Sequence, residues 1–359
     1  MLKRSIICCL LLTAFASGSP GDNLEEFDQC LKACTNKNNC HGFDMDFVSD
    51  NNKFKMIVYD EVPPVLKKFF FWDCDSDCDY RCQQLITRLR ISDGEEIFQF
   101  HGKWPFRRFL TMQEFFSTIF SIGNFFPHLF GFIKLRKAIR RYSSQNGMNS
   151  KNNVVVHLKN YSYVAISGMF AWTASTIFHW RDLPVTENLD YFFAGMTVLM
   201  GFHAIFARIA RLDRKPQYLR GFFWLIVTIF GCHVLRLYLS WSYTYNMRFN
   251  IALGLTQYVL LLVLAFQNYQ SLKVNRKKLD DRLYNSSKEG QVYRLCVVPS
   301  ILVISTALAM SLELFDFFSY TFQIDAHAIW HLSTIWPSWI MYGFFIDDFK
   351  YITTKNNRE

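Results

Sequence analysis

The stretch "NIALGLTQYVLLLVLAFQNY" (residues 250–269) contains no charged residue and is the strongest indication of the fold. An α-helix needs about 20 mainly apolar residues to cross the hydrocarbon of a bilayer. Six other stretches have a similar length and character: 110–133, 162–181, 189–208, 220–241, 294–314 and 327–346. The sequence therefore predicts an all-α membrane protein with a seven-helix transmembrane bundle. The second and seventh spans are the least apolar, because each carries polar groups at one end.

The composition also favours a membrane protein, with 51% hydrophobic, 18% aromatic and only 19% charged residues. The net charge is +9, but the segment 20–105 carries −6, which leaves +15 for the remainder. This excess lies in short loops between apolar stretches. It follows the positive-inside pattern of membrane proteins and argues against nucleic acid as a partner.

The basic residues alternate between successive loops, which predicts the orientation. The second, fourth and sixth connections ("DLPVTEN", "SWSYTYNMRFN" and "DFFSYTFQID") carry at most one basic residue each. The first, third and fifth connections are basic: Lys134, Arg136, Lys137, Arg140 and Arg141; Arg208, Arg211, Arg214, Lys215 and Arg220; Lys273, Arg276, Lys277, Lys278 and Arg282. We expect the basic loops and the C-terminus in the cytosol. The sequons at Asn160 and Asn285 then lie on the cytosolic side, and glycosylation at either would contradict this topology.

The N-terminal part is predicted to be exported. The segment "MLKRSIICCLLLTAFASGS" (1–19) has a basic start, a short apolar core and small residues near its end, as a cleaved signal peptide has. An uncleaved anchor is the alternative. We therefore expect a signal peptide at 1–19, a luminal cysteine-rich domain at 20–105, the transmembrane domain at 106–346 and a cytosolic tail at 347–359.

The cysteines agree with export. Six lie in the luminal segment, at Cys30, Cys34, Cys40, Cys74, Cys78 and Cys82, and an even number in an exported segment predicts disulfides. Fifteen pairings are open for six cysteines. Zinc binding is the alternative, although the CxxC spacing typical of zinc sites is absent. Cys232 and Cys296 lie in apolar stretches and are predicted to be packing residues.

Five polar residues are expected near the luminal edge of the bundle. Ser175 and His179 are four residues apart on the second span, and so are His327 and His331 on the seventh, so each pair shares a helix face. Asp190 begins the third span. In "HAIWH" (327–331), Ala328 stands where the protease motif HExxH has glutamate. Any further ligand or base must therefore come from another helix.

Three imidazoles suit a catalytic zinc site with one open position. We hypothesise that His179, His327 and His331 bind zinc, with Asp190 as general base and Ser175 as a hydrogen-bond donor to the reacting oxygen. Each residue also has a structural explanation without catalysis. Asp190 can be a carboxylate favoured by the dipole at a helix start, and Ser175 a small residue that lets helices pack closely. The two histidines can be amphipathic side chains where a helix enters the membrane. His128, His203 and His233 are predicted to be packed within the bundle. Glu313, Asp316 and Asp325 are candidates for orienting a ligand histidine.

The motifs resemble those of the CREST superfamily of seven-span metal hydrolases, and within it those of the Per1-like family (post-GPI-attachment-to-proteins factor 3). The resemblance covers nearly the whole chain, and its details are most similar to the budding-yeast members. It is carried by "SPGDNLEEFDQCLKAC" (19–34), "WDCDSDCDYRCQ" (72–83), "EEIFQFHGKWPF" (95–106), "QEFFSTIFSIGNFFPH" (113–128), "FHWRD" (178–182), "LDYFFAG" (189–195) and "DAHAIWHLST" (325–334).

This resemblance implies remodelling of the lipid of GPI-anchored proteins by phospholipase A2-type removal of the sn-2 acyl chain. It implies zinc as the cofactor, His179, His327 and His331 as its ligands, and Asp190 and Ser175 as catalytic groups. The implied partners are GPI-anchored proteins, their lipid and the bilayer. The implied location is the endoplasmic reticulum membrane, or the Golgi membrane as in animal members. A ceramidase-like amide hydrolase and a non-catalytic escort factor for GPI-anchored proteins remain alternatives.

Overall fold

The computed structural model describes residues 19–40, 63–146, 154–275, 289–312 and 315–356. Residues 1–18 of the predicted signal peptide, Asn285 and Glu313 lie outside these residues. The chain divides into two compact units. We call Met1–Gln113 with Phe318–Gln323 the N-terminal unit, and Glu114–Phe317 with Ile324–Glu359 the helical unit.

The N-terminal unit is built on two helices joined by disulfides. They are α1 (Glu25–Lys37) and α3 (Cys74–Ser92), with the short α2 (Pro64–Phe69) before α3. Asp73 caps α3 by accepting a hydrogen bond from the Ser76 backbone N–H at 2.8 Å. Asp75 and Asp77 follow in the first turn, where the helix dipole favours negative charge.

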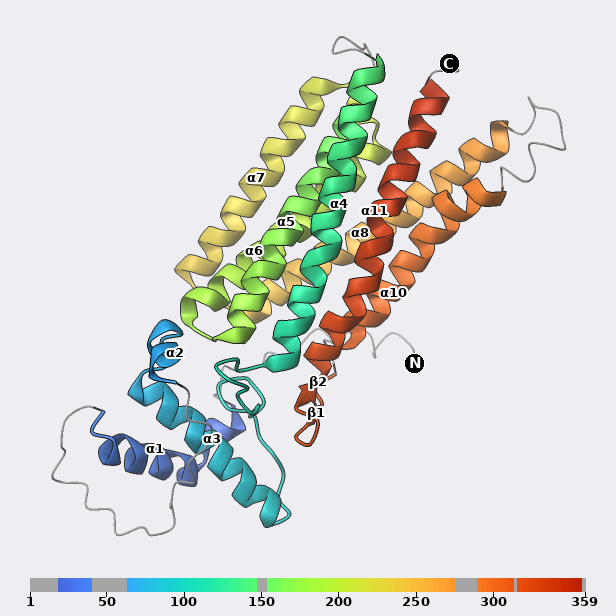
Figure 1. Cartoon of the computed structure of the whole chain (residues 1–359). Coiled ribbons are helices and arrows are strands. Elements are labelled where there is room, and N and C mark those ends of the chain that lie inside the picture. The colour runs from blue at the N-terminus through green and yellow to red at the C-terminus, as the bar shows by residue number, and fades with distance from the viewer. Residues whose placement is uncertain (1–18, 41–62, 147–153, 276–288, 313–314, 357–359) are drawn as a thin grey trace, which may run out of the picture. The chain divides into compact units, whose positions relative to one another are not determined.

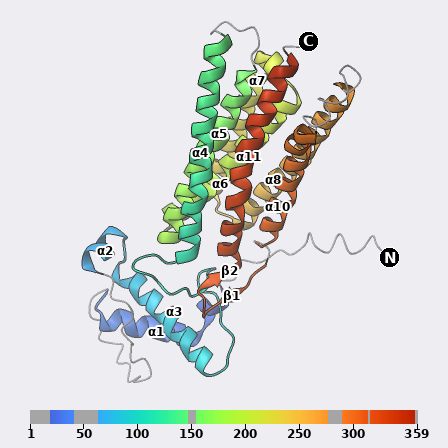
Figure 2. The ribbon, with the colours of Figure 1, turned by 45° about the vertical axis from the view of Figure 1, so that its right-hand side comes forward.

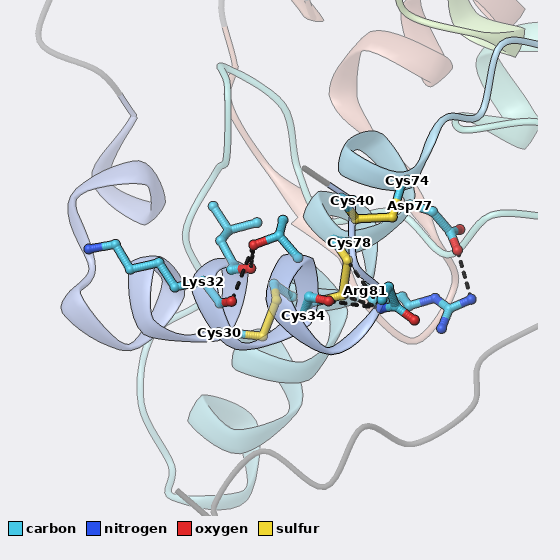
Figure 3. The surroundings of a disulfide bond; sticks show 12 residues. Cys30, Lys32, Cys34, Cys40, Cys74, Asp77, Cys78 and Arg81 are labelled. Atoms are coloured by element: carbon cyan, nitrogen blue, oxygen red, sulfur yellow. Dashed lines mark hydrogen bonds and ion pairs between the residues drawn. A yellow bond between two sulfur atoms is a disulfide. The ribbon is translucent and has the colours of Figure 1, made fainter. Parts of the chain in front are cut away.

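All six predicted cysteines form disulfides, and the structure gives their pairing. The bonds are Cys30–Cys82, Cys34–Cys78 and Cys40–Cys74, and Figure 3 shows the last two. The reversed order along α1 and α3 means that the two helices run antiparallel. Phe27, Ile86 and Phe100 pack around these bonds and complete the small core. Cys232 and Cys296 are free thiols; Cys296 is half-buried, whereas Cys232 is exposed on the helical unit rather than packed inside it.

A buried charge cluster joins α3 to the segment that leads to the first long helix. The Asp77 carboxylate accepts hydrogen bonds from Arg108 and Lys67, each at 2.9 Å, and pairs with Arg81 at 2.7 Å. Burial alone raises the pKa of Asp77, but the bonds from Lys67 and Arg108 outweigh it and lower the pKa below its ordinary value of 3.8. The Arg108 guanidinium also lies over the Trp72 ring, 4.4 Å from its centre.

The N-terminal unit includes a short segment from the other end of the chain, Phe318–Gln323. Strand β1 (Phe318–Ser319) lies in it, whereas β2 (Ile324–Asp325) belongs to the helical unit. Phe318 stacks on Trp104 with ring centres 5.4 Å apart, and the Arg107 backbone N–H donates to the Gln323 side chain. Sequence reasoning treated this stretch only as a connection between two spans.

The helical unit contains seven long helical segments among the described residues (Figures 1 and 2). They are α4 (Phe115–Asn146), α5 (Val155–Trp180), α6 (Pro184–Ile209), α7 (Pro216–Leu239), α8 (Tyr243–Asn275), the segment Glu289–Leu312 that includes α10 (Val298–Leu312), and α11 (Ala326–Asn356). Helix α4 packs on α5 and α11, and α5 packs on α6. Their shared core includes Leu135, Tyr161 and Phe345.

Five of these segments are long and apolar enough to cross a membrane: α4, α6, α7, α8 and Glu289–Leu312. Helices α5 and α11 fall short, and they are the two that the sequence marked as least apolar. Both carry many polar side chains that the bundle buries, among them Ser175, His179, His331 and Asp348. A helix surrounded by other helices presents less surface to lipid and can therefore be less apolar.

The helices extend beyond the predicted spans at the basic end of the bundle. Lys134, Arg136 and Arg140 lie on α4 rather than in a loop, and α11 continues to Asn356. Arg208 is not a loop residue either, because it is buried and donates two hydrogen bonds to Asp348, at 2.7 and 2.9 Å. Asn160 is 3% exposed within α5, which leaves no room for a glycan.

Candidate metal centre

The structure brings His179, His327 and His331 together at one end of the helical unit. His179 lies in the last turn of α5, while His327 and His331 lie in the first two turns of α11. Each residue offers one ligand atom, and the three atoms lie within 4.8 Å of one another. The ring centres of His327 and His331 are 4.5 Å apart because the i, i+4 spacing places both on one face of α11.

The spacing of the imidazole nitrogens fits a zinc ion. The Nε2 atoms of His179 and His327 are 3.3 Å apart. Two nitrogens bound tetrahedrally at about 2.0–2.1 Å from one zinc ion would lie about 3.3 Å from each other. Three histidines are also a ligand set that catalytic zinc sites use.

Glu114 holds His179 in the orientation that the cluster needs. Its Oε2 accepts a hydrogen bond from His179 Nδ1 at 2.9 Å, and its backbone N–H donates to the His179 carbonyl at 3.1 Å. The Glu114 side chain is buried. A carboxylate on Nδ1 keeps the proton there, so the lone pair of Nε2 points toward the other imidazoles.

A chain of hydroxyl groups supports His331 in a similar way. Ser121 of α4 lies with its Oγ 2.9 Å from His331 Nδ1, and Ser175 Oγ lies 3.1 Å from Ser121 Oγ. Nε2 is therefore the His331 nitrogen that remains for a metal. The structure thus connects Ser175 to the cluster through Ser121, on the far side of the His331 ring. Asn124 fixes the backbone by donating to the His331 carbonyl at 2.6 Å.

An aromatic side chain links this cluster to a second buried histidine. The rings of Trp172 and His331 are nearly perpendicular, with ring centres 5.2 Å apart, and Trp172 Nε1 donates to His128 Nε2 at 3.1 Å. His128 Nδ1 lies 2.7 Å from the Tyr342 hydroxyl. His128 is thus packed and hydrogen-bonded within the bundle, as predicted. His203 and His233 are also buried, against Phe222 and Phe249 respectively.

The acidic candidates differ in where they lie. Asp190 is half-buried in the second turn of α6 and is not one of the three residues whose ligand atoms cluster. Its role as a base stays a prediction. Asp325 caps α11 by accepting a hydrogen bond from the Ala328 backbone N–H at 2.8 Å. Burial, together with the nearby Glu114 carboxylate, raises the pKa of Asp325 to about 6. Asp316 is exposed.

A second group of possible ligands is excluded by its chemistry. Cys40, Cys74 and Cys78 also lie within 4.8 Å of one another, but all three are in disulfides. A metal binds the thiolate form of cysteine, and a disulfide offers none. The alternative of zinc binding by these cysteines is therefore wrong for the oxidised protein.

Sequence reasoning missed Glu114, Ser121 and Trp172. Glu114 carries a usable signal, because it is a carboxylate directly before the apolar run that begins α4. Such a residue at the end of a span normally has a partner. Ser121 and Trp172 carry none, since serine and tryptophan are ordinary residues in membrane helices.

The family can now be assigned. The sequence model of the Per1-like family matches residues 64–349, from α2 to the later turns of α11. This chain belongs to the Per1-like family. It is 52% identical to Protein PER1 of Saccharomyces cerevisiae, over 98% of both chains. It is 34% identical to the Protein PER1 homolog of Schizosaccharomyces pombe, over 98% of this chain and 95% of the relative.

A human relative of this Per1-like chain has a name that states an activity. The chain is 31% identical to a Homo sapiens protein named "GPI-specific phospholipase A2-like PGAP3", over 94% of this chain and 92% of that protein. No solved structure matches the Per1-like chain. The family resemblance inferred from the motifs is confirmed.

Proposed function

We propose that this Per1-like chain is a zinc-dependent hydrolase that removes the sn-2 acyl chain from the phosphatidylinositol of GPI-anchored proteins. The observation that carries the proposal is the convergence of three imidazoles, two of which are held through their outer nitrogens: His179 by Glu114 and His331 by Ser121. The name of the human relative supports the lipid class and the type of reaction. The inference of zinc rests on the three-histidine set and the 3.3 Å separation of two Nε2 atoms.

The reaction is the hydrolysis of an ester. Water adds to the sn-2 carbonyl carbon, the bond from that carbon to the glycerol oxygen breaks, and a fatty acid and a lyso-lipid leave. A bound zinc ion would polarise the carbonyl and make water a better nucleophile at neutral pH. His179, His327 and His331 would hold the ion, with Glu114 keeping the ring of His179 in place and Ser121 that of His331.

Asp190 and Ser175 complete the proposal. Asp190 takes a proton from the attacking water and returns it to the departing glycerol oxygen. Ser175, linked to His331 through Ser121, stabilises the charge that develops during the reaction. We assign the proton transfer to Asp190 because it lies in the second turn of α6, the helix that follows the helix of His179 along the chain.

In the proposed topology, the histidine cluster and the ester bonds of the substrate lie at the same edge of the membrane. We propose that all seven long helical segments cross the membrane of the endoplasmic reticulum, with the N-terminal unit in the lumen. The histidine cluster then lies at the luminal edge, since α5 ends there and α11 begins there. A GPI-anchored protein sits in the luminal leaflet, with its ester bonds just below the headgroups. Disulfides, which persist in oxidising compartments, support a luminal N-terminal unit.

The test uses purified full-length protein in nanodiscs with a defined GPI lipid. Released fatty acid and lyso-GPI are measured by mass spectrometry, and bound metal by elemental analysis, for wild type, His331→Ala and Asp190→Ala. We expect about one zinc per wild-type chain, loss of zinc and activity in His331→Ala, and loss of activity with zinc retained in Asp190→Ala. His203→Phe is the control, because it removes a buried imidazole that stacks on Phe222 away from the cluster.

Three outcomes would contradict the proposal. Zinc-loaded wild type that releases no fatty acid from GPI lipid points instead to an escort factor. Faster release of fatty acid from ceramide than from GPI lipid points to an amide hydrolase. Equal zinc content in wild type and His331→Ala shows that the histidines are not the ligands.

A further inference from the structure

Aromatic side chains gather at the same end of the helical unit as the histidine cluster. Tyr191 of α6 and Trp241 of the α7–α8 connection stack face to face, with ring centres 5.1 Å apart and ring planes 8° apart. Tyr243, the first residue of α8, lies 6.1 Å from Tyr191. We call Tyr191, Trp241 and Tyr243 the aromatic platform. Figure 1 shows the α5–α6 turn and the end of α7 at the same end of the bundle.

The aromatic platform is continuous with the proposed metal centre. Phe178 meets Tyr191 with ring centres 6.3 Å apart. The same Phe178 ring lies 5.1 Å from the ring of its neighbour, His179. An unbroken line of rings therefore runs from a proposed zinc ligand to the connection between α7 and α8.

Exposure increases along this line. Phe178 is 6% exposed, whereas Trp241 is 39% and Tyr243 is 49% exposed. Single tyrosine and tryptophan residues are common at membrane interfaces, where they anchor helices. The platform differs from such a belt, because Tyr191 and Trp241 are stacked and the line of ring contacts leads inward to His179.

A cationic group lies at the same turn. Arg236 of α7 is exposed, and its guanidinium donates a hydrogen bond to the carbonyl of Ser240, the residue before Trp241. An arginine at this point suits a phosphate group, which accepts hydrogen bonds from the guanidinium. The exposed end of the line thus combines flat apolar faces with a positive charge.

These features match the headgroup of one lipid class. Sugar and inositol rings present C–H groups on one face, which pack against the electron-rich faces of aromatic rings. We propose that the aromatic platform binds a ring of the glycosylated inositol headgroup, with Arg236 near its phosphodiester. This proposal rests on the proposed function for its choice of lipid. It assigns the recognition of the headgroup to residues that take no part in the hydrolysis itself.

The test measures headgroup binding separately from hydrolysis. Full-length protein in nanodiscs is titrated calorimetrically with a water-soluble, deacylated glycosyl-inositol phosphate, and with glycerophosphocholine for comparison. We expect Trp241→Ala to weaken binding of the first probe about tenfold, which corresponds to about 1.4 kcal/mol. Trp241→Phe keeps a flat ring and should bind within about threefold of wild type. Trp224→Ala, which removes an exposed tryptophan elsewhere on α7, should change nothing.

Hydrolysis assays on the same preparations separate the two proposals. We expect Trp241→Ala to raise KM for GPI lipid, and Trp224→Ala to leave both KM and kcat at their wild-type values. Unchanged headgroup affinity in Trp241→Ala, or equal binding of the two probes by wild type, would overturn the platform while leaving the hydrolase intact. Headgroup binding that depends on Trp241, in a protein that releases no fatty acid, would support the platform and refute the hydrolase.

Discussion

Glu114 is the single residue that best tests the design of the proposed metal centre. Its carboxylate is buried and accepts a hydrogen bond from His179 Nδ1. Replacing such an outer partner of a ligand histidine typically weakens metal affinity about 10–100-fold. We expect Glu114→Gln to lower zinc affinity within this range, because the amide loses the charge that keeps the proton on Nδ1. The measurement is competition for zinc between the purified protein and a chelator.

The matched control is Glu187→Gln, which makes the same change in the first turn of α6. It should leave zinc affinity at the wild-type level. Ser121→Ala provides an independent check, because Ser121 supports His331 as Glu114 supports His179. Equal zinc affinity in wild type and Glu114→Gln would show that Glu114 has no positioning role.

At this scale, the parts of the cluster that lie on one helix were predictable, and the links between helices were not. The spacings Ser175–His179 and His327–His331 each determine a shared helix face. The bond from Glu114 to His179 joins residues 65 positions apart, and that from Ser121 to His331 spans 210. Periodicity along a single helix carries no information about which faces of two distant helices meet.

Helix α5 packs on α4 at a glycine, Gly168, which faces His128 of α4. A Cβ atom at Gly168 would overlap the His128 ring, which occupies the space that the glycine leaves. His128 in turn accepts the hydrogen bond from Trp172, the residue that packs on His331. Small residues at helix crossings permit such close packing inside membranes. The glycine therefore sets the position of a side chain that supports the histidine cluster.

We expect Gly168→Ala to destabilise the protein by about 1–3 kcal/mol, the usual cost of adding volume to a packed core. It should also lower zinc content, because His128 and Trp172 must move. Thermal unfolding in detergent and elemental analysis measure the two effects. Gly343→Ala on α11 is the control, since a Cβ there meets no atom within 4 Å. A Gly168→Ala protein as stable as Gly343→Ala would contradict the packing argument.

The length of an apolar stretch predicted the lipid-facing helices well, and it predicted the helices surrounded by other helices less well. The charge-free stretch 250–269 lies wholly within α8 (Tyr243–Asn275). Helix α11 gave a weaker signal because its apolar stretch includes polar residues such as His327 and His331, and His331 is buried within the bundle. A hydropathy window treats such a residue as solvent-exposed, whereas the bundle supplies its partner.

At the scale of the whole chain, the cysteines predicted disulfides but left fifteen pairings open. The pairing depends on α1 and α3 running antiparallel, which places Cys30 beside Cys82 and Cys34 beside Cys78. The two helices are separated by a long stretch of sequence, so spacing could not determine their direction. The assignment of Phe318–Gln323 to the N-terminal unit could not be predicted either, because local spacing does not show which distant segments meet.

The orientation of the whole chain gives the last prediction. Helix α11 begins at the histidine cluster and ends near the C-terminus, so the two lie at opposite ends of the helical unit (Figure 1). The basic residues at the ends of α4, α6 and α8 predict that the C-terminal end faces the cytosol. In sealed microsomes, added protease should remove an epitope fused after Glu359 and leave the N-terminal unit intact. Detergent should expose both, which controls for membrane integrity.

The opposite result would have a direct consequence for the chemistry. An epitope protected in sealed microsomes would place the C-terminus in the lumen and the histidine cluster at the cytosolic edge. A lipid held in the luminal leaflet by its attached protein has its ester bonds on the other side of about 30 Å of hydrocarbon. The hydrolase proposal would then fail on geometry, even if His179, His327 and His331 bound zinc. Topology and metal content are therefore independent requirements, and the proposed reaction needs both.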